Sequence, residues 1–140
     1  MFAQTSFRGS NSSLMLSGLY RQIGVETGVK TASAHQLVQM LYDGLLESIV
    51  QARGALASQD VEAKGRAVTR AARIVDEGLK AALSPAGGEL TMNLSNLYGY
   101  ITRRLMHAHL HNDAAALDEC HRLVQPLRDA WAEIGAQVQA

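Results

Sequence analysis

Three of the five histidines lie in one short stretch, and they are the residues whose type and spacing come nearest to a chemical site. His107 and His111 are four residues apart and share one face of a helix, while His109 lies on another face. A pair at this spacing can chelate a transition metal. Di-metal sites in four-helix proteins also need inward glutamates and Glu-x-x-His pairs, which the sequence lacks. We therefore predict no metal site and interpret these side chains as surface histidines near a helix C-terminus.

No catalytic set can be assembled from the other polar residues. The sequence does not suggest a Ser–His–Asp triad, a pair of carboxylates in a cleft or a cofactor-binding motif. Gly87-Gly88 lacks the Gly-Lys-Ser/Thr of a phosphate loop and reads as a turn. A histidine phosphotransfer domain is the rival from another class, but His35 lacks a basic neighbour and an adjacent glycine. We expect a protein that is not an enzyme and has no cofactor.

The chemistry left to this chain is binding through apolar surface. Thirteen basic and thirteen acidic residues cancel in 140 residues, so a nucleic-acid partner, which calls for a basic surplus, is not expected. The single Cys120 suits a reducing compartment. The first residues do not read as a signal peptide, and no run of about 18 apolar residues predicts a membrane span. These features predict a soluble protein of the cytoplasm (cytosol), with no membrane partner.

Four helical stretches must position any binding surface. The first is expected to be capped by Thr31 or Ser33 and to run to about Ser58. The second follows a cap at Asp60 and ends before Pro85. The third begins near Glu89 and ends at Asn112-Asp113, which cap the fourth. Pro126 inside the fourth helix predicts a kink or bend there.

Short connections between these long helices predict an all-α fold, an antiparallel up-down four-helix bundle. Residues 1–19, rich in Ser, Gly and Asn, are expected to form a flexible N-terminal arm. A short helical segment, limited by Gly24 and Gly28, is expected between the arm and the bundle. The predicted domains are thus the arm, 1–19, and the bundle domain, 20–140.

Two helices have more apolar width than a bundle stripe of a little over 100° requires. In the first helix the apolar residues cover about half the circumference at ~100° per residue, and Met40 lies outside even that arc. In the third helix four residues lie off the inner stripe: Met92, Tyr100, Met106 and Leu110. A central helix with several neighbours explains such width, and so does a groove for another amphipathic helix, which the arm would cover. The sequence leaves both explanations open.

The residues that carry a family resemblance extend in order from Tyr20 to Trp131. The motifs are Tyr-Arg-Gln-Ile-Gly-Val-Glu-Thr at 20–27, Thr-Ala-Ser-Ala-His-Gln-Leu at 31–37, Met-Leu-Tyr-Asp-Gly at 40–44, Lys-Gly at 64–65, the run from Gly87 to Tyr100, Arg-Arg-Leu at 103–105, Asn-Asp at 112–113 and Ala-Trp at 130–131. In this combination the chain resembles the FliS family of flagellar secretion chaperones. It departs from the family at Ala34, where proline is usual, at Gly99, where an acidic residue is usual, and at the histidines of 107–111.

The resemblance implies a cytoplasmic export chaperone. Such a protein binds the disordered C-terminal segment of flagellin, prevents premature polymerisation and assists delivery to the flagellar type III export apparatus, with export-gate components as a further class of partner. A general helix-binding regulatory module of the flagellar system is the alternative. The hypothetical flagellin-binding groove consists of Tyr20, Leu37, Met40, Leu41, Asp43, Leu45, Leu94, Leu97, Tyr98, Ile101, Arg104 and Trp131.

Each of these residues also has a purely structural interpretation. Tyr20 is either a partner contact or a staple that fixes the arm. The apolar members are partly core by their periodicity, and the sequence does not show which of them line the groove. Asp43 and Arg104 are either anchors for a tail or ordinary helix–helix pairs. Trp131 is expected to pack into the end of the bundle, with the small Ala130 allowing close approach.

Overall fold

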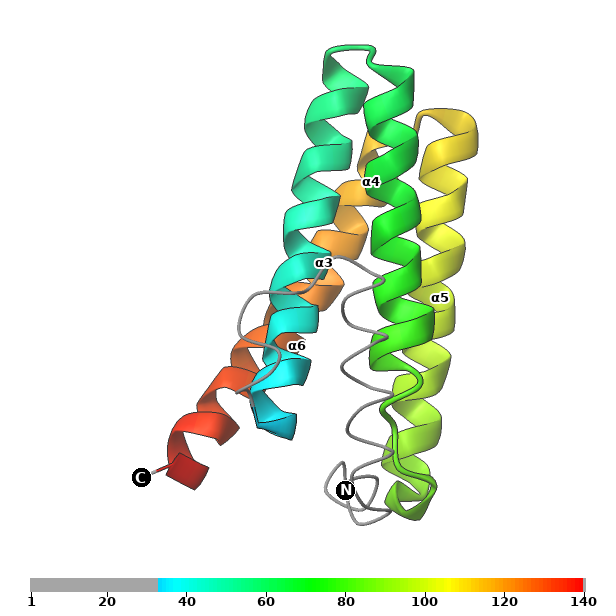
Figure 1. Ribbon diagram of the computed structural model, residues 1–140. Coiled ribbons are helices and arrows are strands. Elements are labelled where there is room, and N and C mark those ends of the chain that lie inside the picture. The colour runs from blue at the N-terminus through cyan, green and yellow to red at the C-terminus, as the bar shows by residue number, and fades with distance from the viewer. Residues whose placement is uncertain (1–32, 140) are drawn as a thin grey trace.

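The computed structural model describes residues 33–139, with side chains through residue 136, and in this part of the chain it contains helices and no strands (Figure 1). The long helices are α3 (Ala34–Ala57), α4 (Val61–Arg73), α5 (Glu89–His111) and α6 (Ala114–Gln139). A π-helical turn, η1 (Ile74–Leu79), continues α4, and a 3-10 turn, η2 (Pro85–Gly87), precedes α5. The predicted arm and short helical segment lie outside the described residues.

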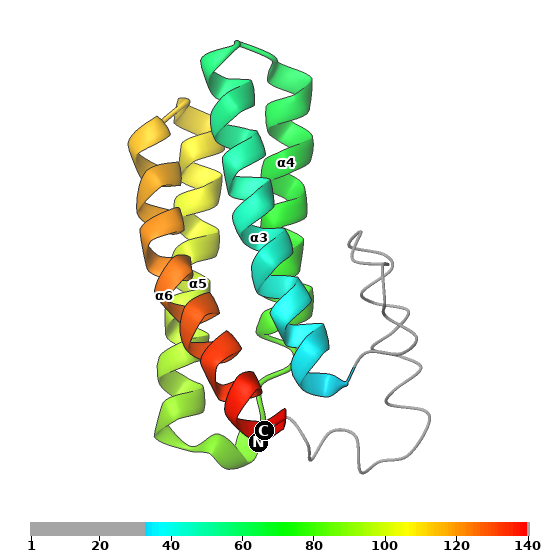
Figure 2. The ribbon, with the colours of Figure 1, turned by 90° about the vertical axis from the view of Figure 1, so that its left-hand side faces the viewer.

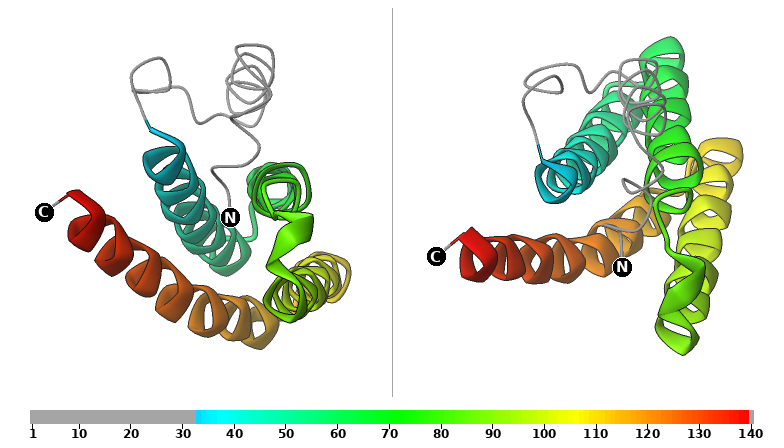
Figure 3. Two further views of the ribbon diagram at one scale, coloured as in Figure 1. Left: turned by 90° about the horizontal axis from the view of Figure 1, so that it is seen from below. Right: turned by 60° about the horizontal axis from the view of Figure 1, so that its bottom comes forward.

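The four long helices alternate in direction along the bundle, which confirms the all-α, up-down prediction (Figures 1 and 2). Helix α3 packs against α4 on one side and α6 on the other, and α5 also packs against α4 and α6. The pair α3 and α6 separates from the pair α4 and α5 toward the end where α3 begins (Figures 1 and 3). None of the described helices is long and apolar enough to cross a membrane.

Helix boundaries follow the polar caps that the sequence predicts. Ser33 caps α3 in a capping box: its Oγ accepts from the Gln36 backbone N–H at 3.1 Å, and its own N–H donates to Gln36 Oε1 at 2.8 Å. Asp60 caps α4 by accepting from the Ala63 N–H at 3.1 Å. Gln59, with a φ of 60°, makes the sharp turn between α3 and α4.

The other two connections each contain a residue with a positive φ: Gly88 before α5 and Asn112 after it. Gly88, with a φ of 59°, precedes α5, and the Thr91 hydroxyl there donates to the Ser84 carbonyl at 2.6 Å. Asn112 ends α5 in the left-handed conformation, and Asp113 accepts from the Ala116 N–H at 3.2 Å to begin α6. Because every cap uses residues close in sequence, these boundaries could be read locally.

Two features of the helices involve backbone geometry. The second helix was predicted as one α-helix, but its last part widens into the π-helical turn η1, where Lys80 N–H donates to the Val75 carbonyl at 2.8 Å. Pro126 lies inside α6 without ending it. Figure 3 shows α6 curved along its length, as expected for a helix that contains proline.

The core contains the inward-facing side chains of all four helices. Its largest fully buried members are Leu41, Leu45, Ile49, Val68, Ile74, Val75, Leu79, Tyr98, Ile101, Leu105 and Leu117. Three polar residues are also buried: Ser48, Lys64 and Ser84. Arg70 reaches the Gly44 carbonyl at 3.0 Å and the Ser48 hydroxyl, so that polar groups between α3 and α4 are hydrogen-bonded.

Candidate functional site

Five of the twelve residues predicted to form the binding groove lie in the core. Leu41, Leu45 and Ile101 have no exposed surface, and Tyr98 and Leu37 are exposed by 2% and 7%. A side chain without exposed surface contacts no partner unless the bundle rearranges. In the structure these five residues therefore support the helices from within.

Four other predicted groove residues are half-buried at the edge of the core: Met40, Leu94, Leu97 and Trp131. Each packs against buried neighbours and still has surface that water reaches. They are the apolar members of the predicted groove that a partner can contact without disturbing the bundle. Tyr20 lies outside the described residues.

The two charged residues of the predicted groove form ion pairs with α6. Arg128 Nε lies 2.8 Å from Asp43 Oδ1, and Arg104 Nε lies 2.7 Å from Glu119 Oε1. Glu119 also accepts from the Tyr100 hydroxyl at 2.5 Å. The hydrogen bond from Tyr100, followed by that from Arg104, lowers the pKa of the Glu119 carboxyl. This cluster ties α5 to α6, as the structural interpretation of Arg104 expects.

The large apolar side chains that remain exposed are concentrated on α5. Met92 is 65% exposed, Met106 40% and Leu110 71%, whereas α3 exposes only Val50 to a comparable degree among its described residues. At ~100° per residue, Met92, Met106 and Leu110 lie on the side of α5 opposite its buried Tyr98, Ile101 and Leu105. We call these three residues, together with Gly99, the α5 outer stripe.

The α5 outer stripe has the spacing of a helix-packing seam. Met92, Gly99 and Met106 are seven residues apart, and Leu110 follows four residues later. A Cβ atom at Gly99 would meet only the flexible end of Arg103, at 3.5 Å, so the surface is open there. A second helix can approach closely at this glycine while its apolar residues contact the flanking methionines.

Two buried tyrosines, which the sequence reading did not pair, join α3 to α5. The hydroxyls of Tyr42 and Tyr98 are 2.6 Å apart. Burial is the main reason that the pKa of both phenols is raised, and the neighbouring hydroxyl adds to the rise at Tyr98. Both groups therefore stay neutral and hydrogen-bonded inside the bundle.

Trp131 packs at the end of the bundle as predicted, but Ala130 is not the residue that allows the close approach. Ala130 is exposed. The His35 ring stacks on Trp131 with ring centroids 4.5 Å apart, and the indole N–H donates to the His35 carbonyl at 2.9 Å. Any Cβ atom at Gly135 would overlap the His35 ring, so Gly135 provides the space. This contact fastens the start of α3 to α6.

The histidines at the C-terminal end of α5 contribute to the turn that follows. His107 Nε2 lies 3.1 Å from Asp113 Oδ2, and the rings of His107 and His111 are 4.5 Å apart. A backbone hydrogen bond from Ala116, then the contact with His107, lowers the pKa of Asp113. The described residues contain no group of three or more side chains placed to hold a metal ion.

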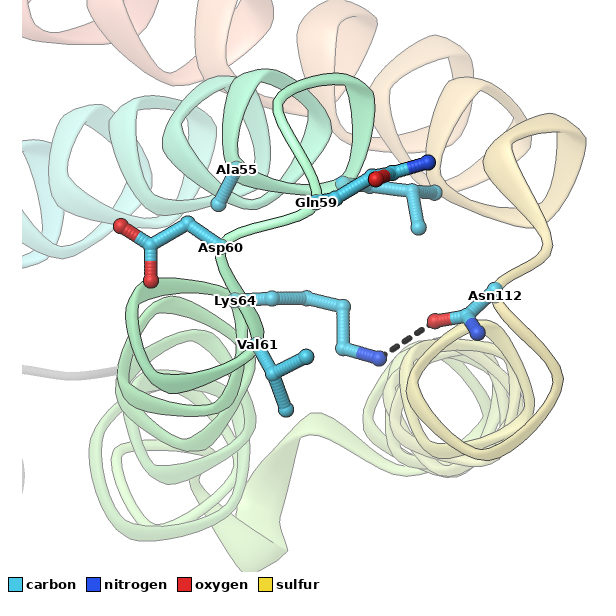
Figure 4. Close-up of a pocket in the computed structure, with 7 residues that line it drawn as sticks. Ala55, Gln59, Asp60, Val61, Lys64 and Asn112 are labelled. Carbon is cyan, nitrogen blue, oxygen red and sulfur yellow. Dashed lines mark hydrogen bonds between the residues drawn. The ribbon is translucent and has the colours of Figure 1, made fainter.

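A pocket of about 300 Å³ opens at the end of the bundle where α3 turns into α4 (Figure 4). It is lined by Ala55, Leu56, Gln59, Asp60, Val61, Lys64 and Asn112. The Lys64 ammonium donates to the His109 carbonyl at 3.1 Å and to Asn112 Oδ1 at 2.5 Å. Lys64 thus binds the C-terminal end of α5. Helical periodicity does not predict that this lysine is buried.

Comparisons with known proteins agree with the sequence motifs. Residues 16–138 match the family model described as Flagellar protein FliS. The flagellar secretion chaperone FliS of Salmonella typhimurium is 47% identical over 116 residues, which cover 82% of this chain and 86% of the relative. The FliS protein of Escherichia coli is 42% identical over an alignment that covers 81% of this chain and 85% of the relative. The FliS protein of Bacillus subtilis is 34% identical over 77% of this chain and 80% of the relative. The chain therefore belongs to the FliS family of flagellar secretion chaperones.

Proposed function

We propose that this protein is a cytoplasmic, non-enzymatic chaperone that binds the C-terminal segment of flagellin. Binding prevents premature polymerisation of the client and allows its delivery to the flagellar type III export apparatus. The observation that carries the proposal is the α5 outer stripe on a chain of the FliS family, because an exposed apolar seam on a soluble helix needs a partner.

The stripe fits a client that folds as it binds. A disordered tail with apolar residues at helical spacing forms an amphipathic helix only when a surface covers its apolar face. Met92, Met106 and Leu110 offer that surface, and Gly99 allows the close approach of the two helices. Ordering the tail offsets about 2–5 kcal/mol of the contact energy, which keeps the complex reversible.

We assign different roles to the residues of the predicted groove. The half-buried Met40, Leu94, Leu97 and Trp131 are proposed as additional client contacts, because they reach the surface. The five buried residues form the support beneath. Asp43 and Arg104 hold helices together through their ion pairs, and Tyr20 stays a predicted contact.

Co-purification with flagellin tests the function. His-tagged chaperone is expected to retain co-expressed full-length flagellin and to lose flagellin that lacks its last few dozen residues. Equal retention of both forms, or retention of neither, would contradict the proposal.

Charge substitutions on exposed residues test the surface. Met106→Asp and Leu110→Asp are expected to weaken binding by about tenfold or more, because each places a charge against an apolar client face. Val50→Asp, which changes an exposed valine on α3, is the matched control and leaves binding unchanged. The affinity is measured by titration calorimetry, with circular dichroism to confirm folding. Equal effects at all three positions would exclude the stripe as the binding surface.

A further inference from the structure

The pocket at the α3–α4 turn combines an apolar wall with a buried positive charge. Ala55, Leu56 and Val61 form the apolar part. Lys64 is 6% exposed and lines the same pocket. Its two hydrogen-bond acceptors, the His109 carbonyl and Asn112 Oδ1, are both uncharged. A buried ammonium is costly unless it is paired, so this charge favours an anion beside it.

The hydrogen-bond donors at this site are not all used. An ammonium has three N–H groups, and among the described residues the Lys64 ammonium has two acceptors. The Asn112 amide accepts from Lys64 through Oδ1, which leaves its two N–H donors without an acceptor in the described part of the chain. Figure 4 shows the ammonium extending toward Asn112 and the Asp60 carboxylate directed away from it. Asp60 instead accepts from the Ala63 N–H that begins α4.

We propose that this pocket binds the terminal carboxylate of the client, an inference that rests on the proposed binding of flagellin's C-terminal segment. The carboxylate accepts hydrogen bonds from Lys64 Nζ and the Asn112 amide, and the last side chain packs on Ala55, Leu56 and Val61. A volume of about 300 Å³ is at the small end of binding pockets and suits one residue. The apolar wall favours a carboxylate on a carbon chain over a hydrated inorganic anion.

The position of the pocket agrees with that of the α5 outer stripe. The stripe ends at Leu110, two residues before Asn112. The α3–α4 turn and the C-terminal end of α5 lie at the same end of the bundle (Figure 1). A tail that runs along α5 toward this end thus brings its last residues near the pocket, which is lined by residues of the α3–α4 turn and by Asn112.

Three forms of the flagellin tail test the inference: a labelled peptide of its last few dozen residues with a free carboxylate, the same peptide with a C-terminal amide, and one extended by two glycines. Their affinities are measured by fluorescence anisotropy. The amide and the extended peptide are expected to bind about tenfold more weakly, the effect of losing one charge-assisted hydrogen bond. Equal affinity of the acid and the amide overturns the inference and leaves the proposed function standing. Absence of binding by all three peptides overturns both.

The obvious variant, Lys64→Met, would also remove the hydrogen bonds that Lys64 makes to the end of α5. The second test therefore adds a charge at the mouth of the pocket instead. Val61 is 70% exposed and lines the pocket at the first position of α4, where glutamate is compatible with the helix. Val61→Glu is expected to lower the affinity for the peptide with a free carboxylate about tenfold and that for the amide far less. The reason is that the new glutamate repels only the charged carboxylate. Val50→Glu, the control on α3, changes neither. Equal weakening of acid and amide by Val61→Glu would refute carboxylate binding.

Discussion

Helices α3 and α5 both carry surplus apolar residues, but only α5 leaves its surplus exposed. Ten of the 24 residues of α3 are buried, compared with four of the 23 of α5. Helix α3 packs along α4, η1 and α6, so the residues of its wide apolar arc are buried or half-buried, apart from the exposed Val50. Helix α5 uses one face for the bundle and keeps Met92, Met106 and Leu110 outside. The width of an apolar arc therefore predicts a binding surface only when the neighbours of that helix are known.

The largest effect is expected when the buried arc of α3 is charged. Leu41→Asp places a carboxylate at a position with no exposed surface. The variant is expected to lose about 5 kcal/mol or more of its free energy of unfolding, comparable with the whole stability of a small domain. Circular dichroism would show an unfolded chain. A folded Leu41→Asp variant would mean that the inner face of α3 is accessible to water and that the contrast with α5 is wrong.

The inner face of α5 can be tested through the thiol that packs against it. Cys120 has no exposed surface, its Sγ lies 3.8 Å from the Ile101 carbonyl, and burial raises the pKa of the thiol from 9.0 to about 12. Above pH 9 the unfolded chain binds fewer protons than the folded chain. The contribution of the thiol to the free energy of unfolding is therefore fully present below pH 9 and is lost as the pH rises toward 12. The expected slope from this group is about 1.4 kcal/mol per pH unit.

Urea unfolding at pH 8 and near pH 11 measures this alkaline loss. Ionisation of the buried tyrosines also lowers the stability of the fold above pH 10. The wild type is therefore compared with Cys120→Ala, which keeps both tyrosines and lacks the thiol. The wild type is expected to lose about 2–3 kcal/mol more than the variant over this range. Equal losses would show that water reaches the inner face of α5.

A smaller effect is expected where α3 and α5 meet. Tyr98→Phe leaves the buried Tyr42 hydroxyl without its partner, which costs about 1–3 kcal/mol. Replacing both tyrosines with phenylalanine removes both polar groups and is expected to recover much of the loss. Thermal unfolding of the two single variants and the double variant gives the coupling energy. Additive losses would show that the two hydroxyls do not depend on each other.

The smallest effect is expected at the open position of the stripe. Gly99→Ala should stabilise the fold by about 0.5–1 kcal/mol, because alanine is the better helix former and the space is free. Gly54→Ala on α3, where nothing lies within 4 Å of an added Cβ, is the matched control and should gain as much. Destabilisation at Gly99 alone, seen by thermal unfolding, would indicate that the free protein already covers its α5 outer stripe.

Features of the fold that depend on near neighbours in sequence were predictable. The caps at Ser33, Asp60 and Asn112-Asp113 follow from hydrogen bonds within one helical turn. The off-stripe Met92, Met106 and Leu110 were also identified from helical periodicity.

The features that sequence reading missed depend on residues far apart in the chain. Gly135 matters because the His35 ring, 100 positions earlier, occupies the space beside it. Lys64 is buried by the end of α5, 45 residues away. Periodicity could not separate groove from core among the twelve predicted residues, because both kinds of position face inward. That distinction depends on how closely the neighbouring helices pack.

In the proposed binding mode, the length of the α5 outer stripe sets the length of the client helix. Eighteen positions separate Met92 from Leu110, which corresponds to about 27 Å of helix at 1.5 Å per residue. A client helix matched to that distance has about five turns, a length that is barely stable alone in water. In the proposed complex, the tail would therefore be helical while it is bound to the stripe and would unfold once it dissociates.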